Sequence, residues 1–178
     1  MQHHWGYLMN IKDVIVAYKT GSQLWANNTK DVDYLVVVKD EAYKDPVIRQ
    51  DGNEYFIMKE SEFKKFLNGD HPKSYYAIVC SQEPIFGSYD VKPDYLSIKS
   101  KVIEKTLQAF YMAPYISAPG GKYCHKHIAW AIWLIYAIEH NSTEITDELK
   151  KMLQQAHDLK LPKSVQDEVR NKLLQLNS

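Results

Sequence analysis

Two aspartates at the start of a valine-rich run are the residues of this chain best suited to chemistry. Asp31 and Asp33 flank Val32, and the run Leu35 to Val38 follows. Alternate side chains of a β-strand point to the same face, so the two carboxylates should project together. Neighbouring carboxylates repel each other unless a cation lies between them, and oxygen ligands suit Mg²⁺. The pair therefore predicts a site for Mg²⁺ or Mn²⁺.

A Gly-Ser pair upstream of the aspartates predicts a turn that can approach phosphate. Gly21 and Ser22 follow a strand that opens with the apolar run Val14 to Ala17. Glycine allows close approach of the backbone, serine offers a hydroxyl, and a helix N-terminus attracts phosphate. A phosphate-binding turn beside an acidic metal site is the layout of a site for phosphoryl or nucleotidyl transfer.

The order Gly-Ser, spacer, Asp-hydrophobic-Asp resembles the DNA polymerase β-type nucleotidyltransferase superfamily. Within it, the chain looks most like the phage and bacterial predicted nucleotidyltransferases called RNA-repair polymerase-β-like. The resemblance is best over residues 14–38, and beyond them it depends on the order of elements, including the segment FKKFLNGDHP. It implies that Gly21 and Ser22 hold the triphosphate of an NTP, and that Asp31 and Asp33 are catalytic and bind metal.

A third carboxylate is expected on the strand predicted over residues 54–58. Glu54 is the best candidate for a catalytic role there, and Glu60 is the second. The superfamily usually has aspartate on this strand with apolar neighbours, so the chain departs from the pattern. Whether the third carboxylate is Glu54, Glu60 or absent stays open at this point.

Lysines near the start of a later helix could contact the phosphates. Lys122 and Lys126 share a helical face with His125. This face either leans over the site and binds nucleotide or acceptor, or is the polar tip of a buried helix. Trp25 either packs in the core or stacks on a base. A local basic patch for a polynucleotide, or a solvated face, is predicted for Lys59, Lys64, Lys65 and Lys73.

Composition limits the partners and the compartment. The 178 residues carry 22 basic and 22 acidic side chains, so no overall charge attracts nucleic acid or membrane. Cys80 and Cys124 are expected as reduced core thiols, and no signal peptide is apparent. The longest apolar run, residues 128–138, is shorter than the roughly 20 residues that span a bilayer. We expect a cytoplasmic protein, in the host cytoplasm if a phage encodes it.

Periodicity and turn signals predict the remaining elements. Residues 40–50 should form a loop or hairpin, and residues 75–80 either an edge strand or the start of a helix. Ser61 and Thr146 should begin helices, Gly69 should follow one, and Ser164 with Asp167 resembles a capping box. Helices are expected over 22–27, 62–67, from 94 to Pro114, over 122–140 and 147–159, and from Ser164 to 176.

The sequence therefore predicts an α+β chain. A nucleotidyltransferase-like core over residues 1–88, with a small mixed sheet and flanking helices, should precede a helical region over 89–178 that packs on it. The predicted activity is Mg²⁺-dependent transfer of NMP from an NTP to an RNA end, a protein or a small molecule. The alternative is a degenerate module that binds nucleotide or a partner protein. Base preference, oligomeric state and pathway stay open.

Overall fold

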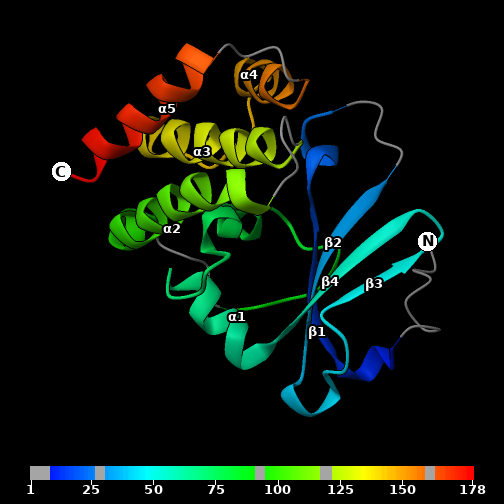
Figure 1. Cartoon of the computed structure of the whole chain (residues 1–178). Coiled ribbons are helices and arrows are strands. Elements are labelled where there is room, and N and C mark those ends of the chain that lie inside the picture. Colours follow the sequence, from blue (N-terminus) through cyan, green and yellow to red (C-terminus); the bar gives the residue numbers. More distant parts are fainter. Residues whose placement is uncertain (1–8, 27–30, 91–94, 117–121, 159–162) are drawn as a thin grey trace.

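Five strands form one mixed sheet in the computed structural model, which describes residues 9–26, 31–90, 95–116, 122–158 and 163–178. The strands are β1 (Val14–Thr20), β2 (Val32–Val38), β3 (Val47–Gln50), β4 (Asn53–Lys59) and β5 (Phe86–Gly87). Their order is β3-β4-β2-β1-β5 (Figure 1). Only the β2–β4 pair is parallel among these described strands.

Helices make up most of the rest of the described chain. They are α1 (Glu60–Leu67), α2 (Tyr95–Ile116), α3 (Lys122–His140), α4 (Asp147–His157) and α5 (Lys163–Leu176), with 3₁₀ helices η2 (Ile11–Asp13), η3 (Ser22–Leu24), η4 (Asp40–Ala42) and η5 (Ser74–Ser81). A small mixed sheet followed by a helical C-terminal half confirms the predicted α+β fold class. Within the described ranges, no helix combines the length and the apolar character that crossing a bilayer requires.

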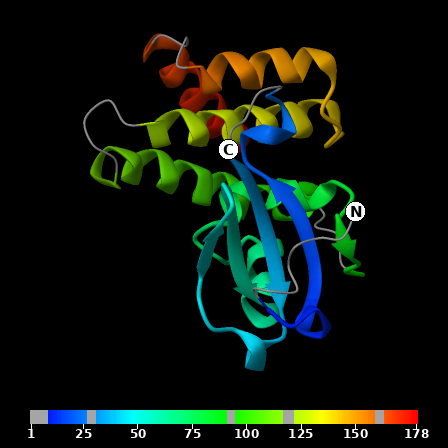
Figure 2. The same cartoon turned by 90° about the vertical axis from the view of Figure 1, so that its right-hand side faces the viewer.

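The bundle of α2 to α5 lies toward the end of the sheet at which β1 ends and β2 begins (Figure 2). One hydrophobic core joins the two parts: Leu35 and Val37 of β2 and Trp133 of α3 belong to it, and all three are fully buried. Val36 and Val38 point to the other face, where they form a second, smaller cluster. The division at residues 88 and 89 into core and helical region stays a prediction.

Successive side chains of β2 point to opposite faces of the sheet, and this decides which way Asp33 points. Leu35 faces the helices, so Asp33, two residues earlier on the same strand, is on the helix-facing side as well. Tyr34 lies on the opposite face, where it stacks on Tyr55 with ring centroids 5.1 Å apart.

Several predicted helix ends are wrong. α1 begins at Glu60 rather than after Ser61, whose backbone N–H donates to Asp40 Oδ1 at 3.0 Å instead. α2 continues past Pro114 to Ile116, because a proline removes one helical hydrogen bond without fixing where the helix ends. α5 already begins at Lys163, so Ser164 lies inside it.

Other local predictions are confirmed. The side chain of Thr146 caps α4 by accepting the N–H of Leu149 at 3.2 Å. Gly69 follows α1 with φ +78°, a backbone region that favours glycine. Residues 40–50 contain the edge strand of a β3–β4 hairpin. Residues 74–81 form the 3₁₀ helix η5, which agrees with the start of a helix and not with an edge strand. Cys80 is a buried free thiol, and the side chain of Cys124 lies outside the described residues.

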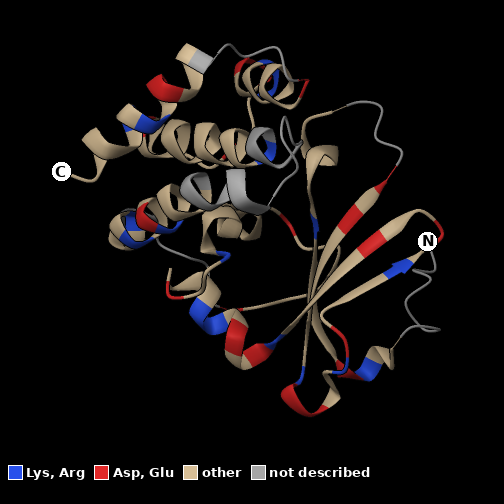
Figure 3. Cartoon of the chain, in the orientation of Figure 1, with Lys and Arg blue, Asp and Glu red and all other residues tan. Residues whose placement is uncertain are grey.

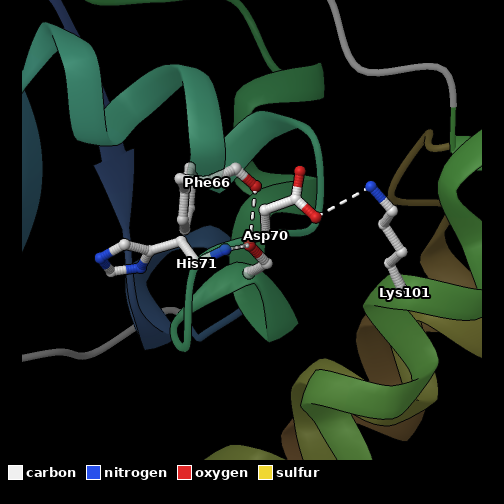
Figure 4. Close-up of polar contacts among 5 residues, drawn as sticks. Phe66, Asp70, His71 and Lys101 are labelled. Atoms are coloured by element: carbon white, nitrogen blue, oxygen red, sulfur yellow. Dashed lines mark hydrogen bonds and ion pairs between the residues drawn. The ribbon is translucent and has the colours of Figure 1, made fainter.

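The turn after α1 contacts α2 through an ion pair (Figure 4). Ser74 is fully buried; its hydroxyl donates to the carbonyl of Phe66 at 2.8 Å and accepts the N–H of His71 at 3.2 Å. Lys101 of α2 pairs with Asp70 Oδ1 at 2.8 Å. These contacts fix the chain between α1 and η5 against α2.

Candidate functional site

The bend after β1 lies directly against the acidic strand. Thr20, the last residue of β1, is opposite Asp33 in the β1–β2 register. Gly21 then turns the chain with φ +78° and ψ −167°, and η3 begins at Ser22. A Cβ atom on Gly21 would overlap the Asp33 carboxylate, so only glycine permits this approach. The structure therefore brings Gly21, Ser22 and Asp33 together at one end of the sheet.

Two neighbouring carboxylates act on Asp33 at this end of the sheet. Asp33 is opposite Glu54 in the parallel β2–β4 register, and the exposed Asp31 precedes β2. Figure 3 shows the acidic segments of β2 and β4 side by side. Partial burial raises the pKa of Asp33, Lys126 lowers it, and the charges of Glu54 and Asp31 raise it again. A half-buried carboxylate among like charges is a position that attracts a cation.

Glu54 already has a cationic neighbour. Arg49, its partner across the β3–β4 hairpin, places Nε 2.5 Å from Glu54 Oε1. The other candidate for the third carboxylate, Glu60, lies past the far end of β4, where it pairs with Lys64 at 3.2 Å. Of the two, only Glu54 lies beside Asp33.

The donor set fits Mg²⁺ through two carboxylates. Within the described residues, no three His, Cys, Asp or Glu side chains are arranged to hold a metal ion. Mg²⁺, however, is commonly held by one or two carboxylates together with substrate phosphates and water. Asp31 and Asp33 supply such oxygens, and the like-charge repulsion at Asp33 is what a cation would relieve.

The start of α3 adds positive charge near the acids. Lys126 is exposed, and its charge reaches the Asp33 carboxylate. Trp25, just after η3, packs edge-on against Trp130 of α3 with ring centroids 5.3 Å apart and is 6% exposed. Trp25 is therefore a core residue that ties the bend to α3. The side chains of Lys122 and His125 lie outside the described residues.

Of the four other lysines singled out by sequence, three already have partners. Lys59 lies over the ring of Tyr43 at 4.9 Å, and Lys73 lies over Phe56 at 5.8 Å. Lys64 pairs with a glutamate at the start of its own helix. A solvated or partnered face describes them better than a patch that binds polynucleotide.

Gln23 is a residue of the site that sequence reasoning missed. Its side-chain nitrogen donates to the carbonyl of Thr20 at 2.7 Å and to the carbonyl of Asp33 at 2.5 Å. The only signal in the sequence is its place directly after the Gly-Ser pair, because its two partners come together through strand pairing.

Comparisons with known proteins give two matches, both to solved structures. Spectinomycin adenyltransferase from Enterococcus faecialis, crystallised with ATP and spectinomycin, is similar at 16% identity over 93% of this chain and 83% of that one, with TM-score 0.45. A nucleotidyltransferase-like protein from Exiguobacterium sibiricum is similar at 11% identity over 96% and 70%, with TM-score 0.34. No protein-family model matches the chain, and no curated protein does. Because both TM-scores are below 0.5, these similarities carry no conclusion about the activity of this chain.

Proposed function

We propose that this chain is a Mg²⁺-dependent nucleotidyltransferase that moves NMP from an NTP to an acceptor hydroxyl. The observation that carries the proposal is the contact of the Asp33 carboxylate with Gly21, across the β1–β2 pair. It sets an acidic centre next to a bend that can approach phosphate. The sequence pattern over residues 14–38 is the support for placing the chain in the phage and bacterial RNA-repair polymerase-β-like group.

The nucleotide is assigned to the β1 side of Asp33. Gly21 lets the bend lie close against the Asp33 carboxylate, and the hydroxyl of Ser22 can donate to a phosphate oxygen. Lys126 adds a positive charge close to Asp33, which balances the charge of the triphosphate. The same role for Lys122, a positive charge near the triphosphate, is proposed from the sequence alone.

Asp31 and Asp33 would hold Mg²⁺, or Mn²⁺, which would supply charge neutralisation at the phosphates and polarise the oxygens that it touches. Glu54 is assigned the acceptor side, because β4 lies on the opposite side of β2 from β1. Its Oε1 is held by Arg49, so Oε2 is the atom that we assign to receive the hydroxyl proton. The acceptor oxygen then bonds to the α-phosphorus, and the bond between the α-phosphorus and the α,β-bridging oxygen breaks, so that this oxygen leaves with pyrophosphate.

Incubation with each α-labelled NTP and Mg²⁺ or Mn²⁺ tests the activity, with RNA, protein and small-molecule acceptors in separate reactions. Label transfer or pyrophosphate release from the wild type, lost in Asp33→Asn and on addition of EDTA, is the expected result. Full turnover by the double variant Asp31→Asn, Asp33→Asn would show that the chemistry takes place elsewhere.

A non-catalytic module that binds nucleotide is the second candidate. Two observations favour it: the ion pair that already engages Glu54, and the absence of a three-ligand metal cluster among the described residues. Saturable binding of an NTP with neither label transfer nor pyrophosphate release, in all acceptor reactions and with both metals, would identify this module.

A further inference from the structure

The side chain of Gln23 bridges the two strands that carry the site. Its Nε2 lies 2.7 Å from the carbonyl oxygen of Thr20 and 2.5 Å from that of Asp33. These residues are opposite each other where the β1–β2 ladder ends. Gln23 itself belongs to η3, the short helix that follows the Gly-Ser bend. One amide group therefore connects the bend, the end of β1 and the start of β2.

The chemistry of this bridge requires an amide at this length. The NH₂ group of glutamine offers two donors on one atom, so both carbonyl oxygens can be satisfied at once. Glutamate has nearly the same shape, but when ionised it has only acceptors. Its carboxylate oxygen would face the two carbonyl oxygens without donating a hydrogen bond to either. Methionine has similar length and no donor. The contacts depend on the identity of residue 23 and not merely on its size.

The bridge also fixes the distance on which the proposed reaction depends. Gly21 is in contact with the Asp33 carboxylate, while Gln23 holds the backbone carbonyl of the same aspartate. The turn of η3 is otherwise closed by backbone bonds from Leu24 to Gly21 at 3.3 Å and from Trp25 to Ser22 at 3.1 Å. These bonds are internal to η3, whereas the amide of Gln23 reaches across to β2.

We propose that Gln23 is a positioning residue, which holds the phosphate-binding bend at a fixed place relative to Asp33. This inference rests on the proposed function and deepens it, since it names what aligns the two halves of that site. Misplacing reacting groups by about 1 Å can cost about 10²-fold in rate. Loss of the bridge should therefore lower the rate far more than it lowers stability.

Gln82 provides a matched control. It is a half-buried glutamine whose Nε2 also donates to two oxygens, Ser81 Oγ at 3.1 Å and the carbonyl of Thr143 at 3.3 Å, away from the acids. The variants Gln23→Glu, Gln23→Met and Gln82→Glu are compared with wild type by thermal unfolding, by the Kd for Mg²⁺-NTP, and by kcat and KM with the best NTP. Amide hydrogen exchange of residues 21–26 is measured without nucleotide.

The expected result is a fall in kcat/KM of roughly 10²-fold for Gln23→Glu and a smaller fall for Gln23→Met. Amide hydrogen exchange across residues 21–26 should be faster in both Gln23 variants. Gln82→Glu should keep the wild-type Kd for Mg²⁺-NTP and the wild-type exchange rate of residues 21–26. If the Gln23 variants lose activity only in proportion to unfolded protein, or bind and react like Gln82→Glu, the inference is wrong. A wild type that binds no NTP would instead refute the proposed function, and the inference with it.

Discussion

Replacement of Gly21 by alanine tests the contact between the bend and the acidic strand. Gly21 has φ +78° and ψ −167°, a region populated almost only by glycine, where another residue costs about 1–3 kcal/mol. The new Cβ would also overlap the carboxylate of Asp33. The substitution should therefore both destabilise the chain and push the proposed metal ligand away from the bend.

Gly69→Ala separates these two effects. Gly69 has the same φ of +78°, and a Cβ there would meet Lys101 Cβ at 2.7 Å, far along the chain from the acids. Both variants should therefore lose about 1–3 kcal/mol of unfolding free energy in urea. Only Gly21→Ala should also lose Mg²⁺-dependent NTP binding, measured by calorimetry at a temperature where both variants are folded.

A Gly21→Ala variant that is folded and binds Mg²⁺-NTP with the wild-type Kd would refute the reasoning. In that case the nucleotide could not depend on the close approach of the bend to Asp33. Equal loss of binding by Gly69→Ala would refute it as well, because the defect would then follow stability rather than the site.

Four further substitutions test other parts of the structure. Asp33→Asn removes a half-buried charge that its acidic neighbours oppose, so the melting temperature without metal should rise while transfer is lost, and added Mg²⁺ should stabilise only the wild type. Arg49→Ala breaks a largely exposed ion pair with Glu54, so unfolding free energy should change by less than about 1 kcal/mol while kcat falls; an unchanged kcat would contradict the role of Glu54. Ser74→Ala should cost about 1–3 kcal/mol in urea titrations, because it removes both hydrogen bonds of a fully buried hydroxyl, whereas Lys101→Ala should cost less than about 1 kcal/mol. Equal losses from the last two would contradict this account of the turn.

Sequence patterns could predict the parts of the fold that local chemistry decides. The valine-rich run after Asp33 and the apolar periodicity of residues 122–140 each read as one element, and each forms it. The run at residues 75–80 is ambiguous in the sequence, because its apolar side chains fit a strand or a helix. Its packing against α1, α2 and α3 resolves it as η5, and packing is tertiary information that a local pattern lacks.

The features of the candidate site also fall into those that local sequence predicts and those that depend on tertiary structure. The period of a strand predicts Asp31 and Asp33 on one face, which stays a prediction because β2 begins at Val32, whereas glycine at the bend follows from close approach. The bond from Gln23 to the Asp33 carbonyl and the pairing of Arg49 with Glu54 depend on strand register, which no short motif encodes. Sequence alone could not choose between Glu54 and Glu60, whereas the parallel β2–β4 register puts Glu54 opposite Asp33.

Strand order also determines the direction from which the two substrates would approach. β2 lies between β1, which ends at the Gly-Ser bend, and β4, which begins near Glu54. If the triphosphate occupies the bend, the attacking hydroxyl must reach the α-phosphorus from the β4 side, since in-line displacement needs the entering and leaving oxygens on opposite sides of the phosphorus. Gly21→Ala should then act mainly on NTP binding, and Glu54→Gln mainly on kcat with the NTP Kd preserved. A Glu54→Gln variant that loses NTP binding but keeps kcat at saturating NTP would reverse this assignment of sides.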